Sequence, residues 1–494
     1  MIRLLPEGAR RTAAATAAAL LALAAAGCAD MGATPPQAKM QTAESLGIAS
    51  AATPATASAP ALDSQWWRDF GDPQLNALVD QAIAGNPNLQ VARARLASAQ
   101  AQVSVVDANG KPHLEGALNL QRQQFPANFI YPSPLGGSTY NIGEARLNFG
   151  WELDFFGRNR TALEAAMGSA NAAAAEADAA RIMLAANVAG GYVQWAYLQD
   201  RLVVAQRALA QRQELLKLVQ DRVAAGLDTR LQLKQSETSV PEARQQIEAI
   251  QEQIAVARHA LDALVAKPRA TEGMTPPQLA NLKAMPLAQN IPADLLGRRA
   301  DIAAARWRAE AASSQVSNAR TQFYPDINLV AFVGLNSLGF DNLLERGSRE
   351  WGVGPAIQLP IFEGGKLRAN LRGKTADLDA AVESYNQTVF DAMRDVSDQI
   401  TTIQSVARQQ VQQKQAQDAA EAAYDIGMQR YRAGLGTFLD VLTAEDSVLA
   451  QRRANVDLAG RAMQTQVALA RALGGGWQPP AAATADASTT TEHR

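Results

Sequence analysis

Hydrophobic and polar residues alternate strictly from residue 144 to residue 155. The apolar side chains stand at every second position: Ala145, Leu147, Phe149, Trp151, Leu153 and Phe155. A period of two predicts a β-strand with one apolar and one polar face. After Gly157-Arg158 the chain becomes rich in Ala, Gln, Leu and Arg, and no proline occurs between Pro134 and Pro241. This pattern predicts one helix over about 159–225, roughly 67 residues and about 100 Å long.

The long helix should break at Gly226, which can take a left-handed cap conformation. A second helix over about 229–265 is then expected to return antiparallel to it, with Pro241 kinking it or disturbing its first turns. Apolar residues recur every seven positions along the long helix and predict a coiled-coil seam. They are Val188, Trp195, Leu202, Leu209, Leu216 and Val223.

The whole pattern returns about 210 residues later, which indicates a duplicated unit. We assign the first copy to residues 63–290 and the second to 291–477, with the second long helix over about 366–433. The expected strands are 112–122 and 143–156 in the first copy, and 325–334 and 350–361 in the second. Ala433-Gly434-Leu435 repeats Ala225-Gly226-Leu227. Closed membrane barrels need about eight strands or more, so four strands per chain predict an oligomeric barrel.

The first residues have the features of a targeting segment. A basic start and an uncharged Ala/Leu-rich stretch predict a signal peptide over 1–27. Cys28, the single cysteine of the chain, follows small residues as in a bacterial lipobox, so we expect it to carry lipid. Residues 28–62 are rich in Ala, Thr, Pro and Ser and predict a lipidated flexible tether. The Ala/Thr-rich residues 478–494 predict a disordered tail.

Composition excludes several classes of function. The formal net charge is −2, so nucleic-acid binding has no electrostatic basis. Beyond the targeting segment there is no run of about 18 apolar residues. His113, His259 and His493 are scattered, and no phosphate-binding glycine loop is present. We therefore expect no enzyme, no metal site and no cofactor.

Several sequence pieces together resemble the TolC-type outer-membrane efflux proteins. The similarity is greatest to the lipoprotein outer-membrane factors of resistance–nodulation–division (RND) pumps, the NodT-like branch, and it spans residues 66–477. The pieces are Trp151-Glu152-Leu153-Asp154-Phe155-Phe156-Gly157-Arg158, Pro292-Ala293-Asp294-Leu295-Leu296-Gly297-Arg298-Arg299-Ala300-Asp301-Ile302, Leu359-Pro360-Ile361-Phe362 and Ala472-Leu473-Gly474-Gly475-Gly476-Trp477. Ala300 departs from the family, which usually has proline there.

The resemblance implies a mainly α-helical fold with a membrane β-barrel portion. Three chains would form one 12-stranded barrel continued by a long helical coiled-coil barrel through the periplasm. Such a homotrimer passively conducts small solutes delivered by a periplasmic adaptor and an inner-membrane pump of RND type. The implied location is the outer membrane, with a lipid anchor and an extension into the periplasm.

The resemblance also implies a periplasmic gate. Tyr431 matches a tyrosine that ties neighbouring helices together, Asp440 an aspartate that rings the aperture, and Leu439 an apolar constriction. Thr443 stands where many members have a second aspartate, and Gly436 where some have an arginine. Plain structural roles compete for these residues, namely a helix-start carboxylate for Asp440 and seam packing for Leu439.

The two turns, Gly226-Leu227 and Gly434-Leu435, match the family's adaptor-docking tips. A glycine cap whose leucine packs onto the turn is the plain structural alternative. Two other functions use similar features. One is a conduit for type I protein secretion, which the same fold serves, and the other is a periplasmic coiled-coil scaffold without a pore.

Overall fold

The computed structural model describes residues 31–32, 35–42, 45, 62–285 and 297–479. The expected signal peptide, Cys28 and residues 480–494 lie outside this part. The helices are η1 (Trp66–Phe70), α2 (Pro73–Gly85), α3 (Pro87–Asn109), α4 (Arg158–Ala224), α5 (Arg230–Val265), η2 (Leu279–Asn281), α6 (Ala300–Thr321), η4 (Arg346–Ser348), α7 (Lys366–Arg432) and α8 (Phe438–Ala472). The strands are β1 (His113–Gln124), β2 (Thr139–Glu152), β3 (Asp326–Leu338) and β4 (Arg349–Gln358).

The chain folds as two compact units. The first holds the described residues up to Met40 together with Leu96–Ala172 and Ala305–Tyr385, and so contains the sheet with the adjoining ends of four helices. The second holds the described residues from Gln41 to Arg95, Ala173–Ala304 and those that follow Asn386. Among the described residues, no helix combines the length and the hydropathy that a membrane span requires.

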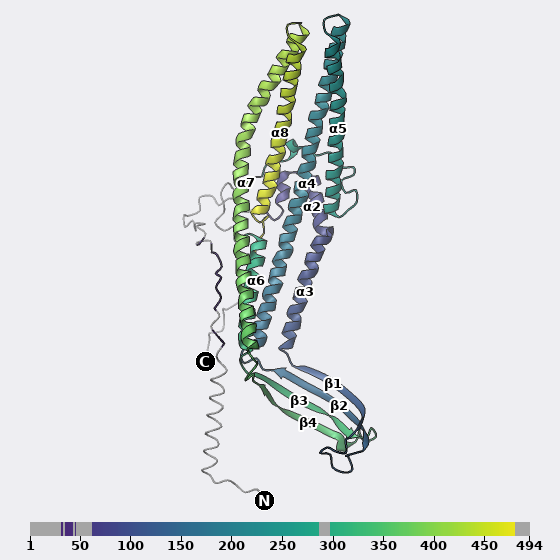
Figure 1. Cartoon of the computed structure of the whole chain (residues 1–494), viewed down its shortest axis with the longest axis vertical. Helices are drawn as coiled ribbons and strands as arrows, with labels where there is room; N and C mark the ends of the chain where they lie inside the picture. Colours follow the sequence, from purple (N-terminus) through teal and green to yellow (C-terminus); the bar gives the residue numbers. More distant parts are fainter. Residues whose placement is uncertain (1–30, 33–34, 43–44, 46–61, 286–296, 480–494) are drawn as a thin grey trace, which may run out of the picture. The chain divides into compact units, whose positions relative to one another are not determined.

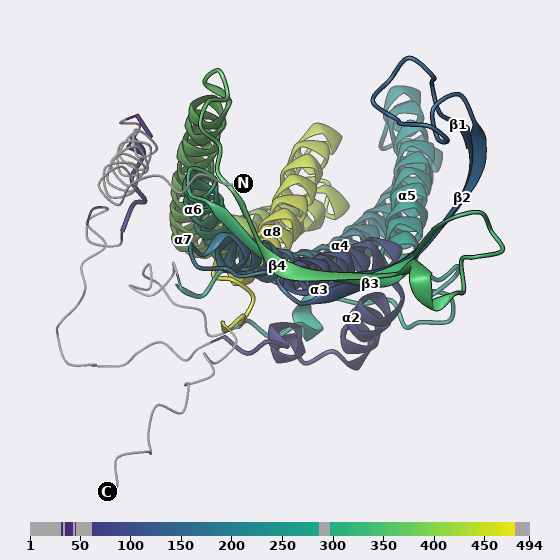
Figure 2. The ribbon, with the colours of Figure 1, turned by 90° about the horizontal axis from the view of Figure 1, so that it is seen from below.

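The sheet of the first unit is a four-stranded antiparallel meander in the order β1-β2-β3-β4, and Figure 2 shows its curvature. Its register places most of the apolar residues of the four strands on one face. Leu118 pairs with Ala145, which pairs with Leu335, and Val333 pairs with Trp351. Many large side chains of this face are exposed: Leu114, Leu118, Leu120, Leu147, Trp151, Val333, Trp351, Val353 and Ile357. The alternation read from the sequence thus gives one continuous, uncovered apolar face.

The polar face of the sheet is held by an arginine that crosses a glycine. Arg146 on β2 pairs with Gly334 on β3, and its Nε donates to Glu350 Oε1 on β4 at 2.9 Å. A Cβ at Gly334 would lie 2.6 Å from the carbonyl oxygen of Ala145, so no other residue fits without movement. The guanidinium also lies 4.6 Å from the ring centroid of Phe332. These contacts tie three strands together in one register.

Two strands end earlier than the alternating pattern suggests. β2 stops at Glu152 because Asp154 turns to the first turn of α4, where its carboxylate accepts from the N–H groups of Asn159 (3.1 Å) and Arg160 (2.9 Å). The chain turns at residues 155–156, which brings the open amide groups of the helix start to this carboxylate, so the strand does not continue to residue 156. β4 stops at Gln358, shortly before Pro360, which has no N–H to donate.

In the second unit, α4 with α5 and α7 with α8 form two long antiparallel hairpins (Figure 1). Val188 and Trp195 of the expected seam are buried, but farther along α4 the buried positions are Leu215 and Val219 in place of Leu216. A straight helix turns by about 20° per heptad against a seven-residue repeat, so the buried stripe moves to neighbouring positions. α5 runs uninterrupted through Pro241.

An N-terminal segment is hydrogen-bonded to the surface of α7. The N–H groups of Gln37 and Ala38 both donate to Asp379 Oδ1 at 2.9 Å, and the N–H of Gln41 donates to Asn386 Oδ1 at 2.8 Å. The composition of residues 28–62 predicts a flexible tether, whereas residues 37–41 are held in place. Backbone amides make these bonds, so the side-chain sequence gives no sign of them.

Candidate functional site

The two helix hairpins end in turns of the same geometry. Gly226 and Gly434 have φ angles of 72° and 75°, in the left-handed region. In each turn the glycine N–H donates to the carbonyl three residues earlier at 3.1 Å, and the next residue, Leu227 or Leu435, donates to the carbonyl five residues earlier at 2.8 Å. This pair of bonds ends a helix and requires a residue that tolerates positive φ.

The leucines of both turns point away from the turns they follow. In this motif an apolar residue after the glycine usually packs back onto the last helical turn. Leu227 is 65% exposed and Leu435 is 72% exposed, so neither does so here. Each hairpin tip therefore presents one apolar side chain to solvent, as expected of a surface that meets a partner.

Each returning helix starts with a reciprocal cap. Thr229 and Gln232 bond each other at the start of α5, and Thr437 and Asp440 do the same at the start of α8. The Thr437 N–H donates to Asp440 Oδ2 at 2.9 Å, and the Asp440 N–H donates to Thr437 Oγ1 at 3.2 Å. The bonds from the Thr437 amide and hydroxyl lower the pKa of Asp440. Asp440 is thus a helix-start carboxylate, and its charge is kept at neutral pH.

Leu439 and Thr443 complete this turn of α8. Leu439 is 70% exposed, so it does not fill the seam within one chain. The Thr443 hydroxyl donates to the Leu439 carbonyl at 2.9 Å and adds no charge to the turn. The start of α8 therefore offers one carboxylate and one uncovered apolar side chain on consecutive residues.

Tyr431 ties the last turn of α7 to the turn between α4 and α5. Its hydroxyl donates to Asp228 Oδ2, which also accepts from Arg222 Nε at 2.9 Å. Arg222 Nη1 donates to the Tyr431 carbonyl at 3.1 Å, and its guanidinium lies 4.5 Å from the centroid of the tyrosine ring. Tyr431 is 1% exposed and the Asp228 side chain 4% exposed. Burial, together with the bond to Asp228, raises the pKa of Tyr431 far above its ordinary value, so the phenol remains a donor.

The sequence identified Tyr431 but not its two partners. Asp228 lies 203 residues from Tyr431 in the chain, and no local pattern links the two. The sequence hints at a special role for Asp228 only when the two turns are compared. Asp228 occupies the position at which the second turn has Gly436. Arg222 lies in the last turn of α4, where a cation is also favoured by the helix dipole.

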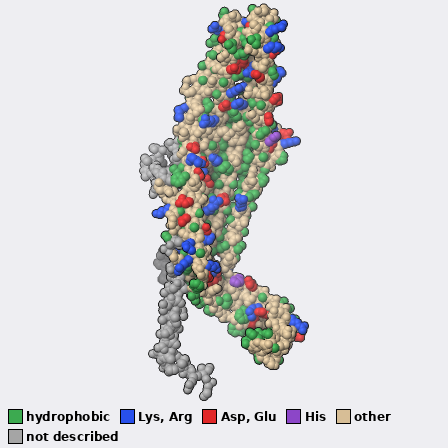
Figure 3. Space-filling view, viewed as in Figure 1, with side chains coloured by type: hydrophobic (Ala, Val, Ile, Leu, Met, Phe, Trp, Pro, Cys, Tyr) green, Lys and Arg blue, Asp and Glu red, His purple; other side chains and the backbone are tan. Residues whose placement is uncertain are grey.

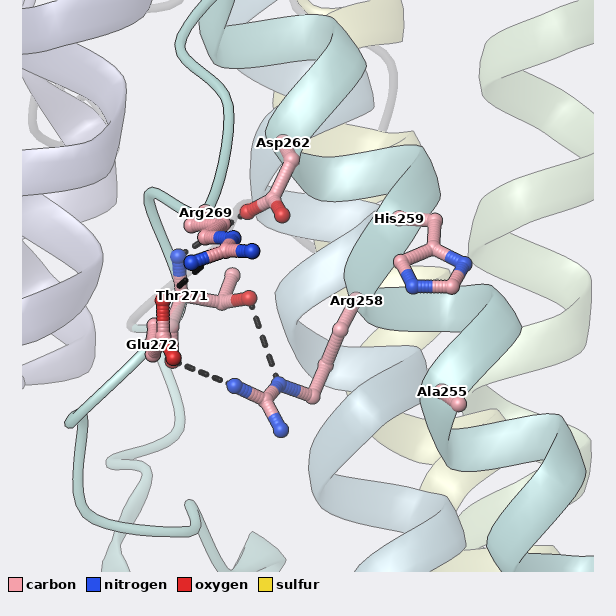
Figure 4. Close-up of a pocket in the computed structure, with 7 residues that line it drawn as sticks. All are labelled: Ala255, Arg258, His259, Asp262, Arg269, Thr271 and Glu272. Carbon is pink, nitrogen blue, oxygen red and sulfur yellow. Dashed lines mark hydrogen bonds and ion pairs between the residues drawn. The ribbon is translucent and has the colours of Figure 1, made fainter.

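A pocket beside the end of α5 is braced by its own polar groups (Figure 4). It is lined by Ala255, Arg258, His259, Asp262, Arg269, Thr271 and Glu272. Arg258 donates to the Thr271 hydroxyl (3.2 Å) and carbonyl (2.9 Å), and the Thr271 N–H donates to Asp262 (2.9 Å). These bonds fasten the segment after α5 back onto the helix, which explains the residue types without a ligand.

The distribution of charged side chains and of possible metal ligands shows no further candidate site among the described residues. On the face shown in Figure 3, basic and acidic side chains intermingle over the helices. The described residues contain no group of three or more His, Cys, Asp or Glu side chains placed to hold a metal ion.

Comparisons with known proteins identify the family. The sequence matches the family described as outer membrane efflux protein over residues 78–267 and 291–475. It is 31% identical over 430 residues to the multidrug resistance outer membrane protein MdtP of Escherichia coli (strain K12), covering 84% of this chain and 87% of that protein. It is 38% identical over 368 residues to the fusaric acid resistance protein FusA of Burkholderia cepacia, covering 73% and 69%.

Solved structures show the same relationship. The fold matches the outer membrane protein VceC of Vibrio cholerae with a TM-score of 0.79 and 36% sequence identity, covering 83% of this chain and 98% of that one. The chain therefore belongs to the outer membrane efflux protein family and is an outer-membrane channel of an efflux system.

Proposed function

We propose that three copies of this chain form a gated duct that passively conducts small solutes out of the cell. The observation that supports the proposal most is the sheet of the first unit, which has an exposed apolar face and a polar face. β1 and β4 lie at the ends of the strand order, so each leaves a row of backbone groups available for another chain. Three copies of four strands make twelve, enough to close a barrel with its apolar face toward lipid.

The gate of this duct is the start of α8. In a trimer, Asp440 supplies three carboxylates and Leu439 three apolar side chains around one aperture. A ring of carboxylates favours cations, and a narrow apolar ring resists wetting. Tyr431 holds the gate hairpin against the α4–α5 turn through Asp228 and Arg222 and so stabilises the closed arrangement.

The exposed tips bind the partner proteins, and the N-terminus binds the membrane. Leu227 and Leu435 dock a periplasmic adaptor, which connects the duct to an inner-membrane pump of the RND class. Cys28 carries lipid and anchors the chain in the outer membrane. The segment held by Asp379 and Asn386 links that anchor to α7.

The decisive experiment measures assembly and conduction together. Purified protein should run as a trimer in detergent and produce discrete conductance steps in planar bilayers. A monomer without channels would refute the duct. Labelling of cells with radioactive palmitate should mark the wild-type chain and not Cys28→Ser, and equal labelling of both would remove the anchor from the proposal.

A further inference from the structure

The seam between the two hairpins contains a charged pair surrounded by apolar side chains. On α4 the buried seam residues are Ala208, Leu215 and Val219. On α8 they are Val441 and Val448. All belong to one apolar cluster of the second unit, and the charged pair lies within the stretch that they define.

The pair is Arg212 on α4 and Glu445 on α8. Arg212 Nε donates to Glu445 Oε1 at 3.1 Å, and Arg212 Nη1 donates to the carbonyl of Ser239 on α5 at 3.1 Å. Glu445 is 2% exposed and the Arg212 side chain 15% exposed. A second carboxylate, that of Glu242 on α5, lies 4.0 Å from Arg212. One guanidinium therefore joins three helices.

Added stability is not the main effect expected of this pair. Burial raises the pKa of Glu445 even though Arg212 opposes the shift, so the ionised carboxylate is less favourable here than in water. Buried ion pairs often stabilise a fold no better than apolar residues of similar size. Their best supported role in helical seams is to fix one register, since a displaced charge would face an apolar residue.

The axial register of α8 matters here because the proposed gate residues Leu439 and Asp440 lie on the same helix. Glu445 follows Asp440 by five residues, about 7.5 Å along the helix. A shift of α8 by one turn, about 5.4 Å, would take Glu445 away from Arg212 and toward Ala208 or Leu215. The same shift would move Leu439 and Asp440 along the channel axis by the same amount.

Other polar contacts along the seam are less restrictive. Arg201 donates to Asp457 at 2.8 Å, but the Asp457 side chain is about half exposed, so water can replace the contact. Arg452 is bound by Glu421 of α7, which lies in the same hairpin, and its Nη1 also donates to the uncharged Gln211 Oε1 on α4 at 2.7 Å. Among these contacts, the pair of Arg212 and Glu445 is the one that joins the two hairpins through a carboxylate removed from water.

We propose that Arg212 and Glu445 form a register pin, which holds α8 at one axial position against α4 and thereby fixes the height of the gate residues. The proposal rests on the proposed function for its consequence at the gate. Both residues are positioning residues, because they act through Leu439 and Asp440. The hydroxyl of Tyr431 restrains the same hairpin at its tip and could hide the loss of the pin. The pin is therefore tested in chains that lack this hydroxyl.

The test compares three chains that all carry Tyr431→Phe. The first has no other change, the second adds Arg212→Met with Glu445→Leu, and the third adds Glu445→Gln. Spin labels at Leu227→Cys and Leu435→Cys report the distance between the two tips, with labelled chains diluted by unlabelled ones. A chain with Cys28 alone gives the background. The exposed pair Lys414 and Asp418 on α7, changed to Gln and Asn, serves as the matched control.

The first and third chains and the control should share one distribution of tip distances, because Gln still accepts from Arg212. The apolar pair should add a second population displaced by roughly 5 Å, one helical turn, without a fall in the melting temperature of the trimer. In bilayers it should open more often than Tyr431→Phe alone. An unchanged distribution of tip distances for the apolar pair would overturn the proposal.

The distance measurement does not depend on channel activity. If the wild-type protein forms no channels, the proposed duct fails while the tip distances still decide whether the pin exists. If the apolar pair shifts the tips but leaves conductance and ion selectivity as in Tyr431→Phe, the pin is separate from the gate and the proposal is wrong in its consequence.

Discussion

Replacement of Tyr431 by phenylalanine tests the tie at the hairpin tips directly. The change removes one hydroxyl and leaves the ring, with its contact to the Arg222 guanidinium, in place. Asp228 keeps its bonds from Arg222, so the variant loses one hydrogen bond to a charged group without leaving that charge unpaired. Such bonds contribute about 1.5–3 kcal/mol.

If the bond exists in the closed duct and is broken in the open one, this energy sets the gate equilibrium. Since about 1.4 kcal/mol corresponds to a factor of ten, the open fraction of a rarely open duct should rise roughly 10- to 150-fold for each chain whose bond breaks on opening. Single-channel recording in planar bilayers measures that fraction. Tyr424 is the matched control, because it is a buried tyrosine one heptad earlier on α7 and its hydroxyl has no hydrogen bond among the described residues.

Tyr424→Phe should leave the open fraction near the wild-type value. An open fraction of Tyr431→Phe within about twofold of wild type would refute the reasoning, as would an equal rise in both variants. The pH dependence gives a second check. A raised pKa means that the contribution of Tyr431 is complete below the unfolded value of about 10 and is lost only above it. The wild-type duct should therefore show no opening from titration of this phenol between pH 7 and about pH 9.

Three further predictions concern the aperture, the tips and the sheet. Asp440→Asn keeps an oxygen for the helix cap but removes the charge, so the cation preference of the duct should fall in reversal-potential measurements. In the wild type, the lowered pKa of Asp440 should preserve that preference at pH 5. Changing Leu227 and Leu435 to serine should weaken adaptor binding in pull-down assays with the trimer intact, and undiminished binding would exclude the tips as the docking surface. Gly334→Ala places a carbon 2.6 Å from the carbonyl oxygen of Ala145, so the trimer should melt at lower temperature than wild type or fail to assemble, whereas Gly354→Ala, with open space at that position, should not.

The regular elements could be predicted because their patterns are local and long. The proline-free stretch predicts α4 to within one residue at each end, whereas β2 begins and ends four residues before the strand expected over 143–156. The exceptions arise where one side chain overrides the pattern. Asp154 continues the polar half of the alternation, but four residues later a helix begins whose amide groups need an acceptor, and that demand ends the strand.

The candidate site was predicted only in part, because its partners lie far apart in the chain. Tyr431 could be placed through a motif, and Gly226 and Gly434 through their cap chemistry. Asp228 could not be paired with Tyr431, since nothing in a single sequence couples positions 203 residues apart. The exposure of Leu439 also needed the structure, because an apolar residue at a seam spacing is equally expected to be buried.

The two turns share a helix end, a reciprocal cap and an exposed leucine, yet they differ at one position that bears on gating. The first turn has Asp228 and the second has Gly436, which offers no side chain. Within the second hairpin, therefore, no carboxylate at this position can hold Tyr431, and the tyrosine hydroxyl binds the turn of the other hairpin. The energy of this contact resists separation of the two hairpins, whereas the bond from Arg452 on α8 to Glu421 on α7 holds the second hairpin together. Opening of the duct should accordingly move α7 and α8 together as one body away from α4 and α5, so that a spin-label distance between Leu227 and Leu435 lengthens on opening while one between Arg430 and Leu435, in the same hairpin, stays constant.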